Sequence, residues 1–149
     1  MSDVDLPQAE ADGLLAMPKV REEDRTWAYP EVGGTISVPL VSEDKRERFG
    51  LDVMRGRLDL RRVKLQTRAR QMVILARLET GGPPHRNPDD SEVRCPHMHL
   101  YREGYADKWA FPVPGDLFGD LDDAWRTLHE FMAFCNITRP PEFERGLFL

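Results

Sequence analysis

Apolar and polar residues alternate with a period of two along much of the middle of the chain. This spacing is typical of β-strands that bury one face. Residues 72–78 are apolar on both faces apart from Arg77, which indicates a central strand covered on two sides. The pattern predicts strands at residues 35–40, 49–54, 58–68, 72–78, 95–103 and 108–113. We expect a strongly curved antiparallel sheet of roughly five or six strands.

A second period, of three to four residues, occurs near the C-terminus. It predicts a helix over residues 121–135, with Asp120 placed to cap the first turn. The apolar stripe of this helix is expected to pack on one face of the sheet. The predicted fold class is therefore α+β, with a single domain over residues 32–149 preceded by an N-terminal arm or short helix at residues 1–31.

Three of the four histidines lie in or just after a loop that cannot be regular structure. Residues 81–91 contain two glycines and three prolines, which removes backbone donors and regular dihedral angles. Residues two apart on a strand point the same way. One face of the strand that follows the loop is therefore expected to carry Cys95, His97, His99 and Tyr101.

These residue types predict acid–base chemistry on a phosphodiester. Imidazoles titrate near neutral pH, so His97 and His99 can act as general base and general acid while Arg77 stabilises charge on phosphate oxygens. This suits a small metal-independent ribonuclease of the toxin type. The predicted catalytic residues are His97, His99, Arg77 and Tyr101. The predicted substrate-binding residues are His85, Asn87, Gln66, Arg68 and Arg102.

Two other interpretations remain open. A His-x-His pair on a strand can supply two zinc ligands, with His85, Asp89 or Cys95 as a third. The sequence has no His-Glu-x-x-His motif and no Cys-x-x-Cys pair, so the prediction includes no metal and no cofactor. Alternatively, the histidines only hold the loop in place. The chain would then be a non-catalytic interaction protein that binds or inhibits a protein or nucleic-acid partner.

The net charge of -5 hides an uneven distribution. Basic residues are concentrated in residues 45–77, whereas residues 1–31 and 115–149 are acidic. The basic segment is expected to face RNA or another anionic partner, or else its arginines pair with the acidic ends of the same chain. Under the interaction hypothesis, the partner is a protein or a nucleic acid.

The remaining features concern the compartment. Cys95 and Cys135 lie far apart and form no recognisable disulfide framework, which fits a reducing environment. No run approaches the roughly 18 apolar residues that a spanning helix needs. Residues 1–12 are acidic and lack the apolar core of a secretion signal. We therefore expect a cytoplasmic protein that does not contact a membrane.

Two motifs are specific enough to suggest a family. They are His85-Arg86-Asn87-Pro88-Asp89 and Cys95-Pro96-His97-Met98-His99-Leu100-Tyr101-Arg102-Glu103-Gly104. With shorter matches from about residue 17 onward, they make the chain resemble an uncharacterised family of bacterial proteins, some of them expected on mobile elements. In that pattern a glycine follows Asn-Pro-Asp, whereas this chain has Asp90. The resemblance implies one intact domain with its site at these motifs, and it implies no activity.

Overall fold

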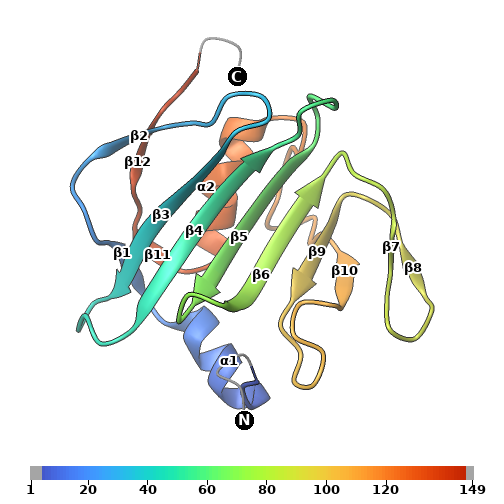
Figure 1. Cartoon of the computed structure of the whole chain (residues 1–149), viewed down its shortest axis with the longest axis horizontal. Helices are drawn as coiled ribbons and strands as arrows, with labels where there is room; N and C mark the ends of the chain where they lie inside the picture. Colours follow the sequence, from blue (N-terminus) through green and yellow to red (C-terminus); the bar gives the residue numbers. More distant parts are fainter. Residues whose placement is uncertain (1–4, 147–149) are drawn as a thin grey trace.

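The architecture is built on one large sheet. The structure is a computed structural model and describes residues 5–146 (Figure 1). The sheet has eight strands in the order β10-β9-β6-β5-β4-β3-β1-β11. Every neighbouring pair is antiparallel except β1 and β11. The bounds are β1 Lys19–Arg21, β3 Thr35–Ser42, β4 Arg48–Arg55, β5 Val63–Ala69, β6 Val73–Thr80, β9 His97–Leu100, β10 Ala110–Pro112 and β11 Ile137–Arg139.

Two small strand pairs accompany the main sheet. Strand β2 (Thr26–Ala28) pairs in parallel with β12 (Glu142–Glu144), which ties the two ends of the chain together. Strand β7 (His85–Arg86) pairs antiparallel with β8 (Glu92–Val93), so the loop predicted from the glycines and prolines closes as a hairpin. This hairpin extends beside β9 and β10 at one edge of the molecule (Figure 1).

The structure confirms a single α+β domain but corrects the predicted strand count. The main sheet has eight strands rather than five or six, because β1 and β11 have only three residues each and are too short to show an alternation. The strand predicted at residues 58–68 begins only at Val63. Residues 56–62 form a turn instead, closed by a hydrogen bond of 2.8 Å from the Gly56 amide to the Arg62 carbonyl.

One face of the sheet is apolar and packs against a helix. Strand register aligns Val53, Leu65, Leu78 and Met98 across four neighbouring strands. Helix α2 (Ala124–Phe134) adds Leu128, Phe131 and Met132 to the same core, and it lies behind the sheet in Figure 1. The predicted helix was therefore in the right place but too long. Its cap is Asp123, whose side chain accepts a hydrogen bond from the Arg126 amide, and not Asp120.

The N-terminal segment completes this core. Helix α1 (Gln8–Ala16) buries Ala11 and Leu14, and Leu6 is buried just before it. None of the helices within residues 5–146 has the length and hydrophobicity needed to cross a membrane.

The opposite face of the sheet is polar, and it positions the candidate site. Register places Asp52, Gln66, Arg77 and His99 in one row across β4, β5, β6 and β9. The adjacent row contains Lys64, Glu79 and His97. Because side chains alternate between faces along a strand, these charged and imidazole groups lie on the side away from the apolar core.

Candidate functional site

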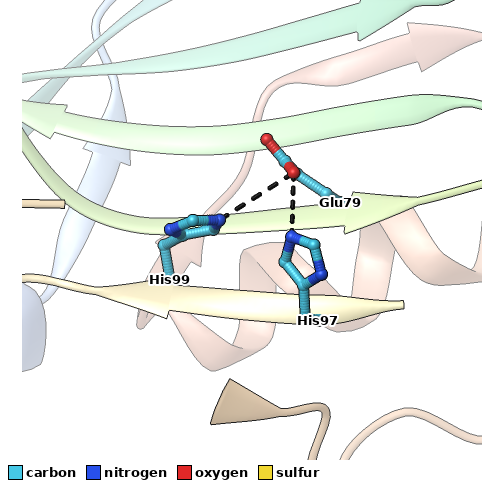
Figure 2. Close-up of side chains that lie close together, drawn as sticks. All are labelled: Glu79, His97 and His99. Carbon is cyan, nitrogen blue, oxygen red and sulfur yellow. Dashed lines mark hydrogen bonds and ion pairs between the residues drawn. The ribbon is translucent and has the colours of Figure 1, made fainter. Parts of the chain in front are cut away.

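The site forms where β6 and β9 run side by side. Arg77 and Glu79 are two residues apart on β6, and His97 and His99 are two residues apart on β9. The antiparallel register pairs Arg77 with His99 and Glu79 with His97. Figure 2 shows Glu79 pointing at both imidazoles from the neighbouring strand. The strand alternation alone therefore brings a carboxylate and two histidines together.

Each oxygen of the Glu79 carboxylate has its own partners. Oε2 lies 2.9 Å from His97 Nε2 and 3.8 Å from His99 Nε2. Oε1 lies 3.1 Å from Arg77 Nε and 3.5 Å from Lys64 Nζ. Arg77 also forms an ion pair with Asp107 through Nη1. The carboxylate is thus shared between two imidazoles on one side and two cations on the other.

Burial differs sharply within this cluster. His97 and His99 are only 0% and 1% exposed, whereas the side chains of Glu79 and Arg77 are 18% and 16% exposed. The cluster therefore reaches solvent through the side that carries the carboxylate and the guanidinium.

Neighbouring groups and burial set the charge states of Glu79 and His97. Contact with the His99 ring, which lowers this pKa only if Nε2 carries a proton, and the neighbouring Arg77, His97 and Lys64 hold the pKa of the Glu79 carboxyl well below its usual range, although burial opposes this. Burial lowers the pKa of the His97 imidazole, and contact with Glu79 offsets this only in part. At neutral pH the site therefore presents a carboxylate anion next to a neutral imidazole.

His99 has a defined tautomer. Its Nδ1 lies 2.7 Å from the backbone carbonyl oxygen of Asp107, and a carbonyl can only accept, so Nδ1 carries the hydrogen. In the neutral ring, Nε2 is then a bare lone pair that faces the Glu79 carboxylate. Among the described residues, this buried nitrogen has no hydrogen-bond partner. A lone pair facing an anion is unfavourable unless a proton or another cation lies between them.

The β7–β8 hairpin covers the histidines. The ring centroid of His85 lies 4.6 Å from that of His99 and 5.9 Å from that of His97. His85 Nε2 donates to the Lys108 carbonyl at 2.7 Å, which leaves Nδ1 of the neutral ring as an acceptor. Asn87 fastens the hairpin, because its amide donates to the Ala110 carbonyl at 3.0 Å and accepts from the Ala110 amide at 2.8 Å.

This arrangement is suited to holding a metal ion. One nitrogen from each of His97 and His99 and one oxygen of Glu79 all lie within 4.8 Å of one another. Ligands of one zinc ion lie roughly 3–3.5 Å apart, since each bond is about 2.0–2.2 Å long. The observed 2.9 and 3.8 Å lie on either side of that range. The hydrogen bond from His99 Nδ1 to the Asp107 carbonyl is also the contact that metal-binding histidines usually make through the nitrogen that does not bind the metal.

Comparison with known proteins identifies a family but no activity. The model of a family of unknown function (DUF6978) matches residues 6–137, which is most of the chain. The chain belongs to this family. Searches of curated proteins and of solved structures each gave no match. The DUF6978 match spans the whole cluster and the hairpin that covers it, so the site is part of the family domain.

Other residues predicted for the site have partners elsewhere. The Tyr101 hydroxyl accepts from the Leu6 amide at 2.7 Å and donates to the Leu6 carbonyl at 2.8 Å, which anchors the N-terminal segment. Gln66 and Arg68 both donate to Asp52 on β4, and Arg68 does so through two nitrogens. Arg102 stacks on Trp109 at 4.4 Å.

The alternative zinc ligands suggested from the sequence are also engaged. Asp89 accepts from the amide and the hydroxyl of Ser91 in the hairpin turn. Cys95 Sγ accepts from the Gly82 amide and donates to the Glu79 backbone carbonyl. Neither group belongs to the cluster in which three ligand atoms converge.

Sequence reasoning missed Glu79 and Asp107. Glu79 was detectable, because Arg77 and Glu79 follow the same two-residue period as His97 and His99. The predicted strand at residues 72–78 ended two residues before β6 does, at Thr80, and so left out Glu79. Asp107 lies in the turn after β9, where no periodic pattern marks its direction.

Proposed function

We propose that Glu79, His97 and His99 bind one divalent transition-metal ion, preferably zinc, and that this centre performs hydrolysis. The observation that carries the proposal is the buried Nε2 of His99, which has no hydrogen-bond partner among the described residues and faces a carboxylate at 3.8 Å. A cation between them satisfies both groups. Two imidazoles and one carboxylate are also a ligand set found in hydrolytic zinc sites.

Zinc suits the charges and the coordination number. Imidazole must be neutral and carboxylate ionised to bind a metal, and the pKa directions of His97 and Glu79 favour those forms. Three protein ligands would leave a fourth position for water, and the 18% exposure of the Glu79 side chain gives the cluster access to solvent. His85, whose ring packs edge-to-face 4.6 Å from that of His99, is the next imidazole beside the cluster.

A zinc ion held by Glu79, His97 and His99 would supply a water nucleophile at neutral pH, because zinc lowers the pKa of a bound water to about 7. Hydrolysis of a phosphodiester would join the oxygen of that water to phosphorus and break the bond to the leaving oxygen, and the proton lost by the water would pass to the leaving oxygen. Arg77 and Lys64, which contact the other oxygen of the Glu79 carboxylate at 3.1 and 3.5 Å, would be the cations that stabilise negative charge on phosphate oxygens. The proposal is thus a metal-dependent version of the ribonuclease expected from the sequence.

A metal-free ribonuclease is the second candidate, favoured by the 2.9 Å contact between His97 and Glu79. In that mechanism Glu79 orients His97 as general base, and a protonated His99 acts as general acid. The same residues are used, and a proton takes the place of the metal between His99 and Glu79.

Cleavage of mixed RNA separates the two candidates. The full-length protein is assayed as purified, after EDTA treatment, and after zinc is added back, alongside a His99→Gln variant and a His129→Gln control. His129 is exposed on α2, far in sequence from the cluster, so its variant should keep full activity. The fold of each variant is checked by circular dichroism.

Each outcome has a distinct meaning. Cleavage that EDTA abolishes, zinc restores and His99→Gln lacks supports the metal-dependent centre. Cleavage that survives EDTA but is lost in His99→Gln supports the metal-free mechanism. Absence of cleavage by folded, zinc-loaded protein rejects a ribonuclease and favours a non-catalytic interaction protein.

A further inference from the structure

A basic groove lies next to the cluster. It has a volume of about 380 Å³ and is formed by the end of β4, the β4–β5 turn at residues 56–62 and the start of β5. Four cationic side chains line it, against a single carboxylate, that of Asp59. The cationic residues are Arg55, Arg57, Arg62 and Lys64.

Within residues 5–146, the three arginines of the groove are not neutralised by ion pairs, unlike several other basic residues of the middle segment. Arg48, Arg68, Arg70 and Arg77 each form an ion pair with a carboxylate, so part of the predicted basic segment is internally neutralised. Among the described residues, no ion pair is formed by Arg55, Arg57, Arg61 or Arg62. Asp59 uses its carboxylate within the turn, where it accepts from the Arg61 amide at 2.9 Å. With Lys64 paired to Glu79, the groove keeps the positive charges of Arg55, Arg57 and Arg62 against the single carboxylate of Asp59.

Lys64 connects the groove to the cluster. It lines the groove, and its Nζ lies 3.5 Å from Glu79 Oε1. An anionic chain in the groove would therefore extend past Lys64 toward Glu79 and the histidines. The groove also has apolar surface, which Met54 and Leu58 provide. Leu58 is 96% exposed.

We propose that this groove binds single-stranded RNA and leads its backbone to the Glu79–His97–His99 cluster. Phosphates would contact the arginines, while bases would pack against Met54 and Leu58. The role of RNA as substrate rests on the proposed hydrolytic centre, but binding in the groove does not require the metal. The two proposals can therefore fail separately.

The test is fluorescence anisotropy with a labelled 12-nucleotide single-stranded RNA of mixed sequence. EDTA is present, so the RNA stays intact if cleavage needs the metal. The groove variant is Arg57→Gln/Arg62→Gln. The matched control is Lys45→Gln/Arg46→Gln, which removes the same charge from exposed residues in the turn at the other end of β4.

We expect the groove variant to bind about tenfold more weakly at 100 mM salt, with a salt slope smaller by about 1.4, or about 0.7 for each lost phosphate contact. The control should bind within about twofold of wild type. Equal loss in both variants, or no RNA binding by folded wild type, overturns the proposal. So does preferential binding of phosphatidylserine vesicles or of polyglutamate over RNA, which would indicate a membrane or an acidic protein partner.

Discussion

His99 connects Asp107 to Glu79 through the two nitrogens of one ring. Nδ1 donates to the Asp107 carbonyl at 2.7 Å, and Nε2 lies 3.8 Å from the Glu79 carboxylate. The first contact decides which nitrogen carries the hydrogen, and the second leaves a lone pair next to an anion. This relationship is the reason to propose a cation at this position rather than a purely structural pair of histidines.

Glu79→Gln should weaken metal binding without rearranging the strand. The amide keeps the shape of the side chain, but it removes the negative charge that the two imidazoles and the metal share. We expect the affinity for zinc to fall by more than about tenfold. Competition with a chromophoric chelator measures this, and Glu92→Gln, an exposed site on β8, is the control. Equal zinc affinity in both variants would contradict the role of Glu79.

Asn87→Ala should detach the β7–β8 hairpin from β10. The substitution leaves the buried amide and carbonyl of Ala110 without the partners that Asn87 provides. We expect a loss of about 2 kcal/mol in the free energy of unfolding, measured in urea by tryptophan fluorescence. Asp89→Ala removes an exposed carboxylate from the same turn and should cost less than about 1 kcal/mol. Similar losses of unfolding free energy in both variants would show that the hydrogen bonds of Asn87 to Ala110 do not hold the hairpin in place.

Lys19→Met should be strongly destabilising. Lys19 is 0% exposed, and its Nζ donates to the carbonyls of Leu15, Met17 and Cys135 at 2.7–3.0 Å. Methionine is similar in size to lysine, but it leaves the three carbonyl oxygens without their hydrogen-bond donor. We expect a loss of about 3 kcal/mol, against little change for the exposed Lys45→Met. A loss below 1 kcal/mol would mean that water replaces the ammonium readily.

The same lysine predicts a pH dependence. Burial lowers the pKa of the Lys19 ammonium from 10.5 to about 8 in the folded protein. Below pH 8 both states hold the proton, but between pH 8 and 10.5 the folded state releases it first, so this group makes folding more favourable as the pH rises. Relative to Lys19→Met, wild type should gain roughly 1 kcal/mol between pH 7 and 9. A constant difference across that range would contradict the lowered pKa.

The two cysteines should differ in reactivity. Cys135 is fully buried, and burial raises the pKa of its thiol to about 12, so the reactive thiolate is scarce. Cys95 is partly exposed. We expect native protein to release one equivalent of thionitrobenzoate rapidly from Ellman's reagent, and Cys95→Ser to release none until it is unfolded. Rapid reaction of two thiols would show that the core around α2 opens.

Local patterns were sufficient to predict the polar row of the site. The two-residue period puts His97 and His99 on one face, and adjacent strands then bring Gln66 and Arg77 into the same row. The three- to four-residue period likewise located α2. These features depend on neighbours along the chain and on simple strand pairing, so the sequence contains them directly.

Long-range partners could not be predicted in the same way. Tyr101 was grouped with the histidines by its spacing, but its hydroxyl bonds Leu6 across a separation of 95 residues. Arg68 is predicted to bind substrate, whereas its guanidinium forms an ion pair with Asp52 at 2.6 Å on the neighbouring strand β4. The partner of a polar group depends on which strands become neighbours, and short strands such as β1 and β11 leave no periodic signal to reveal that.

Metal content is the most direct test of the central claim. Full-length protein is incubated with excess zinc, passed through a desalting column and analysed by inductively coupled plasma mass spectrometry, alongside the His99→Gln variant. The account predicts about one zinc ion per wild-type chain and loss of it in the variant, since each of the three ligands is needed to hold the ion. A folded wild-type chain without zinc, or with equal zinc in both proteins, would contradict a metal centre at Glu79, His97 and His99.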